Sequence, residues 1–468
     1  MKQTIFKSAI VVFLFLLTLL VFKLLQKPAI FFPTLGNITH TYSLDTINKK
    51  NAIVTDIHPY DYLNNENTVK WDAIHYNDIR LNYYSRAEWT YSFFPLFPLF
   101  WKISQVPPLY IGLLNYLLFG IAIILFSILL FNAQEVSPYE RMCAFVIALV
   151  LPTIVSFYLP YPEALFIITF ALALWGLVKK KYWMFFIFFA LAAMARPIFV
   201  TVGLAIVMIE IFYFIKHRNI KHFLKHLSLA LAPLLVGTCI VFFMYYLNSG
   251  SFTKYFATNF KYWKVAFSIP QKISDWSSEG YGMNVFTVCF VIIPSAFLLL
   301  NNFIKLLKSE KSKELQTIFN GNLSFTKEYF FNFSIIYFWG IFFYVLFFQK
   351  GSLNGLSRYI LATPFFYIYL FCAIPMLKNT KWLKFAIGTA VILVLSLLMF
   401  QMFPKHRPSI NFNDSGFITL FLDLIFLFTM KYMNKIVKIV SLTIITFYSI
   451  VWITYLYNIY IHGAWIFT

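Results

Sequence analysis

Long runs of apolar residues alternate with short polar stretches along almost the whole chain. Many runs have a length of about 17–25 residues, which an α-helix needs to cross the hydrocarbon core of a bilayer. The pattern predicts about thirteen membrane-spanning helices. They are expected at 10–25, 109–132, 141–160, 162–178, 182–195, 197–215, 224–247, 283–304, 329–349, 356–377, 382–403, 414–431 and 436–461. We therefore expect an all-α polytopic membrane protein in which residues 1–468 form a single integral membrane domain.

The composition supports this class and changes how the net charge is interpreted. Hydrophobic residues make up 60% of the chain and charged residues only 12%, too few to cover the surface of a soluble protein of this length. A net charge of +20 raises the question of nucleic-acid binding. The basic residues, however, lie in short loops between apolar runs, where they determine topology. We expect contact with membrane lipids, no nucleic-acid partner, and no disulfide or metal spacing among the four cysteines.

The distribution of basic residues predicts an orientation. If the N-terminus is cytoplasmic, the inner loops contain the basic clusters at 179–181, 216–225 and 305–327, as the positive-inside rule requires. The run at 10–25 is then an uncleaved signal anchor. The two longest outer loops are 27–108 and 248–282. We expect a multi-pass protein of the cell membrane, with any chemistry on its extracytoplasmic face.

One carboxylate in the first outer loop is the strongest catalytic candidate. Asp72 follows Trp71, and an aromatic anchor at the membrane interface fixes the depth of its neighbours. The stretch 71–84 contains no Pro or Gly, so a short interfacial helix is expected, with His75 on the same face as Asp72. Asp72 is the candidate general base. His75 and Trp71 are candidates for substrate binding, and most other charges of this loop are expected to be solvated.

Further candidates lie at the outer ends of apolar runs: Glu163, Arg196, Arg358 and Tyr359. An arginine at membrane depth is costly unless it meets an anion or lines a wet cavity, and two arginines can clamp a phosphate with paired donors. Simpler interpretations remain open. Glu163 also suits the first turn of a helix, and either arginine can extend its charged end to the interface.

Aromatic residues accompany these charges in both outer loops. The stretch 93–100 is apolar with two prolines, which predicts a kinked entry into the next span and a wall of a lipid-accessible groove. The loop 248–282 combines Lys with Trp and Tyr. These are ordinary residues of a membrane interface, or they form a shelf for a sugar or a lipid headgroup.

Several of these segments resemble one family. The stretches 71–76 (WDAIHY) and 92–99 (SFFPLFPL) resemble the paired WD-x-x-x-F/Y and FFPLYPL signatures of the PIG-V-type mannosyltransferases, as in a prokaryotic member. The stretch 161–166 (YPEALF) is similar to the family's Y-S-E-S-L-F, with Pro and Ala replacing the serines. Arg196 falls at an R-S-N-G-like turn, from which 197–199 departs, and 357–359 with Pro364 resembles a late R-Y/F…P element.

The resemblance implies a GT-C glycosyltransferase with its catalytic acid in the first large outer loop. Eukaryotic members add the second mannose to the glycosylphosphatidylinositol anchor. The implied donor is a polyprenyl-phosphate-linked sugar, usually mannose, and the implied acceptor is a lipid-linked or surface glycan or glycolipid. The implied transfer is inverting, which requires one base and no carboxylate nucleophile. The resemblance assigns no certain cofactor and leaves open whether a divalent metal assists.

Two other classes of function remain open from the sequence. A membrane transporter or a flippase of lipid-linked glycans would use the same helices and the same arginines, but it would not need Asp72 as a base. A membrane-bound acyl- or phosphotransferase is the third class, although its usual histidine or serine signatures are missing.

Overall fold

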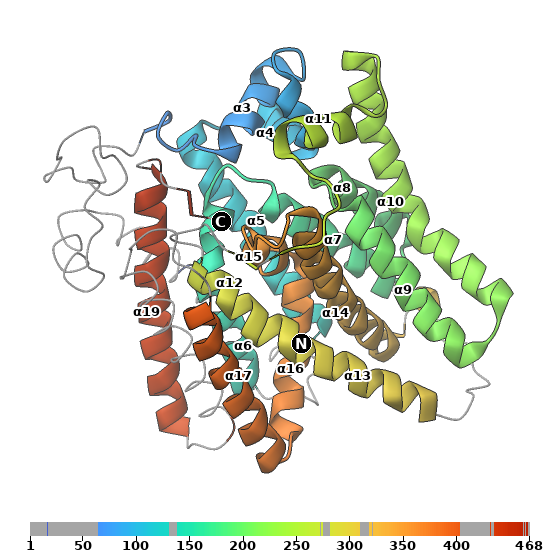
Figure 1. Ribbon diagram of the computed structural model, residues 1–468, viewed down its shortest axis with the longest axis vertical. Coiled ribbons are helices and arrows are strands. Elements are labelled where there is room, and N and C mark those ends of the chain that lie inside the picture. Colours follow the sequence, from blue (N-terminus) through green and yellow to red (C-terminus); the bar gives the residue numbers. More distant parts are fainter. Residues whose placement is uncertain are drawn as a thin grey trace, which may run out of the picture.

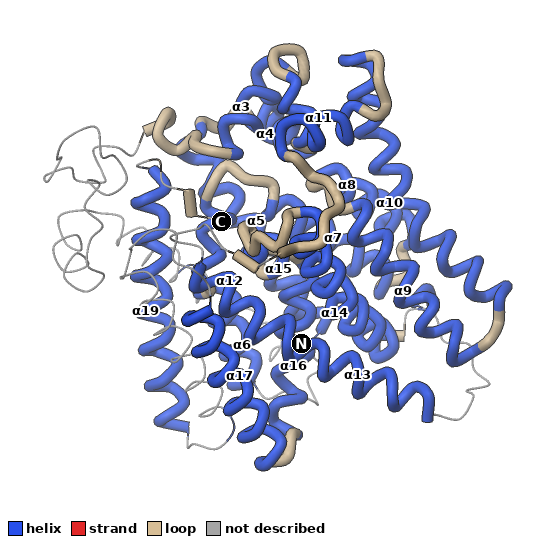
Figure 2. The backbone as a smooth tube through the Cα atoms, viewed as in Figure 1, coloured by secondary structure: helices blue, strands red, loops and turns tan. Residues whose placement is uncertain are grey.

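The computed structural model describes Leu16 and residues 64–130, 138–271, 273–274, 281–308, 318–320, 322–402, 431, 435–461, 463 and 465–466. Within these residues the protein is helical and has no strand (Figures 1 and 2). An isolated parallel bridge joins Ser274 to Ser352. The predicted spans at 10–25 (Leu16 aside) and 414–431 (all but its last residue), and residues 27–63 of the first outer loop, lie outside the described residues.

The α-helices follow one another along the chain with short connections. They are α3 (Asp72–Asn82), α4 (Leu96–Ser104), α5 (Pro108–Leu130), α6 (Pro138–Val150), α7 (Glu163–Val178), α8 (Tyr182–Ala195), α9 (Phe199–His217), α10 (Ile220–Ser249), α11 (Lys254–Trp263), α12 (Tyr281–Thr287), α13 (Ile293–Lys308), α14 (Leu323–Phe348), α15 (Leu356–Ile360), α16 (Pro364–Asn379), α17 (Trp382–Met402) and α19 (Lys435–Ile461). Short 3₁₀ segments are η3 (Glu88–Ser92), η4 (Pro152–Tyr158) and η6 (Ile318–Asn320), and a π-helical turn at Val288–Ile292 joins α12 to α13.

Helix length and composition confirm the membrane class. Among the described residues, four helices are long and apolar enough to cross a bilayer: Pro108–Leu130, Ile220–Ser249, Met283–Ile304 and Leu323–Phe348. Shorter apolar helices accompany them, including α7, α8 and α16. The chain is therefore an all-α membrane protein in the part described, while the count of thirteen spans stays a prediction.

Two predicted spans are not continuous helices, and the prediction was wrong there. The run 141–160 contains the end of α6 and then η4, and the run 356–377 contains α15 and then α16. Each break falls at a proline. The preceding residues, Leu151 and Thr363, are both extended, because the proline ring disfavours the α conformation of its predecessor. Both breaks lie beside the polar site described below.

Two glycines allow neighbouring segments of the bundle to pack closely. A Cβ added to Gly112 of α5 would lie 2.1 Å from the carbonyl oxygen of Tyr158 in η4. A Cβ added to Gly237 of α10 would lie 2.3 Å from the carbonyl oxygen of Ala190 in α8. Only glycine permits such approach of one backbone to another, which is the usual way that membrane helices pack tightly.

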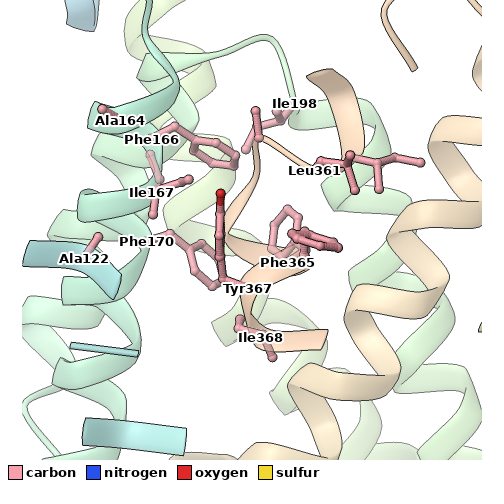
Figure 3. Packing of buried hydrophobic residues seen from close by; sticks show 14 of the residues in the cluster. Ala122, Ala164, Phe166, Ile167, Phe170, Ile198, Leu361, Phe365, Tyr367 and Ile368 are labelled. Atoms are coloured by element: carbon pink, nitrogen blue, oxygen red, sulfur yellow. The ribbon is translucent and has the colours of Figure 1, made fainter. Parts of the chain in front are cut away.

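Aromatic side chains fill the interior between α7 and α16 (Figure 3). The ring of Phe365 meets Phe170 edge-to-face at a centroid distance of 5.0 Å and Phe166 at 6.1 Å. Phe166 and Phe365 are fully buried. Such pairs add about 0.5–1.5 kcal/mol each beyond their buried area. This rigid core holds the starts of α7 and α16 together, immediately next to the site.

Loops predicted on the same side of the membrane meet in the structure. The first and second outer loops contact through η3 and α11, at the end of the bundle where α3 and α4 also lie (Figure 1). Near the opposite end, Tyr182 donates a hydrogen bond to the carbonyl oxygen of Phe319, and His226 packs against the Phe319 ring. The grouping of loops follows the charge pattern, while their orientation across the membrane stays a prediction.

Candidate active site

Four of the polar residues singled out in the sequence meet in one ion cluster, formed by Asp72, Glu163, Arg196 and Arg358. Arg358 lies at its centre. Its Nη1 donates to Oδ2 of Asp72 at 2.5 Å, and its Nε donates to Oε1 of Glu163 at 2.7 Å. Arg196 Nη1 lies 3.4 Å from the same Glu163 oxygen. The cluster therefore joins two carboxylates and two guanidiniums from four separate segments.

The members of the ion cluster differ in exposure. The Glu163 side chain is 0% exposed, whereas Asp72 is 21% exposed and Arg358 is 8% exposed. Glu163 forms the inner side of the cluster and Asp72 its accessible edge. The Oε2 atom of Glu163 is buried without a hydrogen-bond partner among the described residues, so this carboxylate retains acceptor capacity.

A buried amide in α5 holds the turn that leads to Glu163. The Nδ2 atom of Asn115 donates to the carbonyl oxygens of Leu159 at 2.8 Å and Tyr161 at 3.0 Å. Asn115 is completely buried. It satisfies two carbonyls that have no helical partner, because the chain between η4 and α7 is irregular. Glu163 then begins α7, so the helix-start interpretation is correct, but the two guanidiniums add a second role.

Arg358 is positioned by the short helix α15. Gly355 precedes α15 with φ 77°, a left-handed conformation that glycine adopts without a steric penalty. The backbone N–H of Ser357 donates to Oδ1 of Asn284 at 2.9 Å. On the far side, Tyr337 donates to the carbonyl oxygen of Tyr359 at 3.2 Å. These contacts direct the Arg358 side chain inward toward α7 and α3.

The two parts of the sequence signature pack on one another around Asp72. A helix was expected at 71–84 and is present as α3, while its place at a membrane interface stays a prediction. Its Tyr76 is buried and meets the rings of Phe93 and Phe97 edge-to-face at 5.2 and 5.4 Å. Before α3, the hydroxyl of Tyr460 in α19 donates to the carbonyl oxygen of Lys70 at 2.8 Å. Asp72 is thus held from both sides of its helix.

His75 lies on α3 but does not join the ion cluster. Its ring packs 4.6 Å from Phe93 and 6.4 Å from Trp263 of α11. Burial lowers the pKa of the His75 imidazole below its usual 6.5, although Asp72 and Asp78 act to raise it. The ring is therefore mainly neutral near pH 7. The role of His75 in substrate binding stays a prediction.

The two remaining candidates lie at the border of the site. Trp71 is exposed, and its ring packs 5.2 Å from Trp465. The ring of Tyr359 lies 5.9 Å from the Arg196 guanidinium, so Tyr359 supports an arginine. Neither side chain makes a hydrogen bond or ion pair with Asp72, and their role as substrate-binding residues stays a prediction.

Sequence analysis missed two residues that shape the site. The Tyr161 ring lies 4.5 Å beneath the Arg358 guanidinium, and Tyr161 is itself part of the YPEALF stretch, which was a usable signal. Asn115 gave no such signal, because a single amide inside a long apolar run is common in membrane helices. Both residues act by fixing the positions of charged groups.

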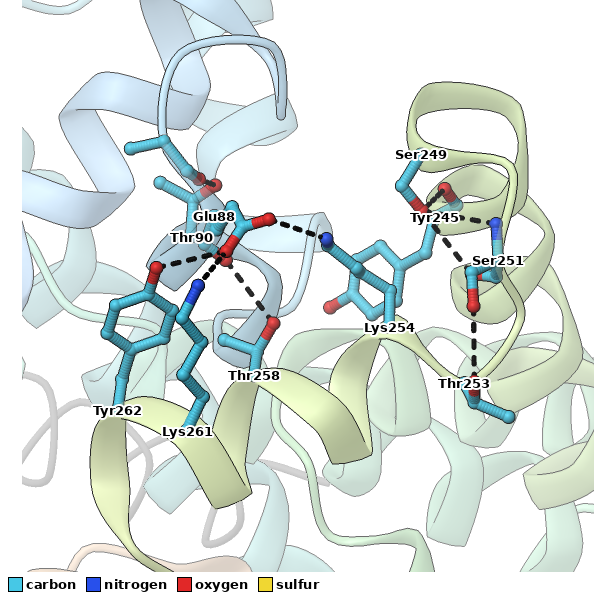
Figure 4. A network of polar contacts seen from close by, with 11 residues as sticks. Glu88, Thr90, Tyr245, Ser249, Ser251, Thr253, Lys254, Thr258, Lys261 and Tyr262 are labelled. Atoms are coloured by element: carbon cyan, nitrogen blue, oxygen red, sulfur yellow. Dashed lines mark hydrogen bonds and ion pairs between the residues drawn. The ribbon is translucent and has the colours of Figure 1, made fainter.

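A second polar cluster joins the two outer loops and is exposed (Figure 4). We call it the Glu88 cluster. The Glu88 carboxylate accepts from Lys254 at 3.0 Å, from Lys261 at 2.7 Å and from the Tyr262 hydroxyl at 3.0 Å. These partners lower the pKa of Glu88 to about 2, mainly through Lys261 and Lys254. The helix α11 that supplies them was not predicted. Glu88 was among the loop charges expected to be solvated, and its side chain is 47% exposed, but its partners in α11 were not foreseen.

In the described part of the chain, no group of three or more His, Cys, Asp or Glu side chains is arranged to hold a metal ion. The two carboxylates of the ion cluster are both engaged by Arg358. Comparisons of the chain with protein-family models, with curated proteins and with solved structures found no match.

Proposed function

We propose that the protein is an integral membrane glycosyltransferase of GT-C type that moves a sugar from a polyprenyl-phosphate donor to a hydroxyl of a lipid-linked or surface glycan. On the family resemblance the sugar is mannose and the transfer is inverting. The ion cluster is the observation that carries this proposal. Residues 286 and 195 positions apart are brought into direct contact, although burying charges is costly and needs a compensating function or partner.

The chemistry assigned to each residue follows from its exposure and charge. Asp72, at the accessible edge, accepts the proton of the acceptor hydroxyl. The acceptor oxygen forms a bond to the anomeric carbon, the bond between that carbon and the phosphate oxygen breaks, and the electron pair stays on the phosphate. Arg358 and Arg196 stabilise the charge that develops there, since guanidinium donors match phosphate oxygens. Glu163 holds both arginines in place.

The proposed setting is the extracytoplasmic face of the cell membrane. The donor is a lipid and approaches through the bilayer, so no soluble nucleotide is required. Glu163 and Arg358 lie in the first turns of α7 and α15, Arg196 follows the end of α8, and Asp72 belongs to the first outer loop. This agrees with the grouping of loops described above, in which all four segments of the ion cluster belong to the side predicted to face outward.

A transporter or flippase of lipid-linked glycans is the second candidate. The same two arginines would favour it, because charged residues at membrane depth often mark a path for an anionic group. A flippase, however, breaks no bond and has no hydroxyl to deprotonate. It would use Asp72 only as an ion-pair partner of Arg358 and not as a proton acceptor.

The test compares cells that carry the wild-type gene, no gene, Asp72→Asn or Asp78→Asn. Mass spectrometry of lipid-linked and surface glycans identifies the product. General-base catalysis contributes about 10²–10⁴-fold, so Asp72→Asn should lower product formation by that order. Asp78 accepts from Asn82 within α3 and has no contact with the ion cluster, so Asp78→Asn should retain activity. Near-normal product with Asp72→Asn would exclude the proposed mechanism.

A further inference from the structure

The ion cluster is electrically balanced before any ligand binds. It contains two carboxylates and two guanidiniums in mutual contact, so its formal charges sum to zero. Placing a phosphate diester against Arg358 adds one negative charge to a largely buried site. Buried charge without a partner is strongly disfavoured. The Nη1 and Nε atoms of Arg358 already donate to Asp72 and Glu163, so an anion that takes either position on Arg358 must replace a carboxylate there.

The geometry distinguishes the two carboxylates. Glu163 is fully buried, faces both arginines, and follows a turn fixed by Asn115. Asp72 is the more exposed of the two and contacts Arg358 through one nitrogen, Nη1. An anion arriving from the accessible edge can therefore replace Asp72 without disturbing Glu163. Glu163 is the permanent partner of Arg358, and Asp72 is the exchangeable one.

We propose that the site binds its donor by anion exchange, in which the donor phosphate displaces the Asp72 carboxylate from Arg358. This inference rests on the proposed function and adds a regulatory step to it. Bound to Arg358, the Oδ2 atom of Asp72 already accepts a hydrogen bond from Nη1, so this oxygen is not open to the acceptor hydroxyl. Displacement frees the carboxylate only when the donor phosphate is in place. Binding of the donor therefore makes the Asp72 carboxylate available as the base.

The exchange also accounts for product release. Before transfer, Asp72 and the phosphate diester each carry one negative charge. After transfer the proton resides on Asp72, which is neutral, and the polyprenyl phosphate carries two negative charges, so total charge is conserved. When Asp72 loses its proton to solvent, its carboxylate competes again for Arg358. That competition favours departure of the polyprenyl phosphate.

The decisive measurement is binding of polyprenyl phosphate to the full chain in lipid nanodiscs. Asp72→Asn removes the competing anion, so binding should become tighter by about 10- to 100-fold, the range expected for a hydrogen bond to a charged group. Asp78→Asn is the matched control and should bind as wild type does. Unchanged or weaker binding by Asp72→Asn overturns the exchange.

A parallel titration with inorganic phosphate separates the two sources of the anion. If Asp72→Asn binds both probes more tightly than the wild type does, the exchange is supported and the phosphate group alone is what the site recognises. If Asp72→Asn binds polyprenyl phosphate more tightly but inorganic phosphate equally, the exchange is supported and the ligand is the lipid phosphate. No tightening with either probe contradicts it.

A second measurement uses the wild-type chain and does not depend on folding of a variant. Carbodiimide labelling of carboxylates is read by mass spectrometry with and without polyprenyl phosphate. Displacement from Arg358 should increase labelling of Asp72 and leave Asp78 unchanged, and decreased or constant labelling of Asp72 counts against the exchange. If Asp72→Asn loses sugar transfer but does not bind polyprenyl phosphate more tightly, the proposed transferase function stands and the anion exchange is contradicted. If Asp72→Asn binds more tightly but the wild-type chain transfers no sugar, the exchange stands and the transferase function is contradicted.

Discussion

The ion cluster and the Glu88 cluster both connect distant parts of the chain through carboxylates and cations, yet they differ in exposure. Glu163 is 0% exposed, whereas the Glu88 side chain is 47% exposed. Charges in water are weakly coupled and screened by salt, while charges in a buried site interact strongly and are costly to leave unpaired. The first arrangement suits the control of chemistry, and the second suits the fastening of two loops.

The comparison assumes that both clusters lie on the extracytoplasmic face of the membrane. Cysteine labelling tests this assumption. Single cysteines replace Arg86, Lys264 or Lys180 in a chain without native cysteines, and an impermeant thiol reagent is added outside the cell. Arg86→Cys and Lys264→Cys belong to the two outer loops and should react. Lys180→Cys lies in a predicted inner loop and should not. Reaction at position 180 from outside would reverse the orientation.

The largest energetic effect is expected from Arg358→Ala. It leaves Asp72 and Glu163 without their shared cation, and loss of one partner of a buried pair costs about 3–5 kcal/mol. The amount of folded protein and its thermal stability should both fall. Arg358→Lys is the control, because it keeps the charge but cannot bridge both carboxylates with a planar fork. Recovery by lysine of stability and of donor binding together would count against the bridging geometry.

A smaller effect is expected from Arg196→Ala. Arg196 approaches Glu163 at 3.4 Å, and Glu163 retains its bond to Arg358. The stability loss should be about 1–3 kcal/mol, as for removal of one interaction of a charged group, while donor use should weaken more than folding does. Donor affinity measured on folded protein in nanodiscs checks this. Unchanged affinity would place the phosphate elsewhere.

The smallest effect is expected from Glu88→Gln. Exposed pairs contribute little and are screened by salt, so sugar transfer should persist and any loss of stability should disappear at high salt. The pKa of Glu88 is lowered from 4.5 to about 2. Its contribution is therefore present above pH 4.5 and is lost as the pH falls toward 2.

Hydrogen exchange of α11 in nanodiscs follows this loss directly. In the wild type, protection of residues in α11 should decrease between pH 4.5 and 2, whereas Glu88→Gln should lack that step. A salt-independent loss of activity in Glu88→Gln would mean that the two clusters are coupled, and the distinction drawn between them would no longer hold.

Much of the ion cluster could be anticipated from sequence because charges at the ends of apolar runs are rare and costly. That argument selected Glu163, Arg196 and Arg358, while Asp72 was selected in the first outer loop because Trp71 precedes it. It could not pair them, since contacts between residues 286 positions apart leave no trace in local periodicity. The sequence therefore predicted two arginines available for phosphate, whereas in the structure carboxylates already engage them.

Fold prediction succeeded for element type and failed at breaks and short helices. Apolar runs located α5, α10 and α14, because hydropathy is a strong signal over twenty residues. It overlooked α11, where Lys and aromatic residues look like ordinary interface composition. It also extended helices through Pro152 and Pro364, although proline chemistry already predicted an interruption at both positions.

The bond between Tyr460 and the Lys70 carbonyl has a consequence for how the protein is made. The segment beside Asp72 leaves the ribosome early, but its partner in α19 emerges 390 residues later. Contacts at such separation form slowly because the intervening chain must first be arranged. Helices between them can insert one after another, yet the geometry around Asp72 is complete only after α19 has entered the membrane. A nascent chain that has not reached Tyr460 would therefore carry all four charged residues without a finished site.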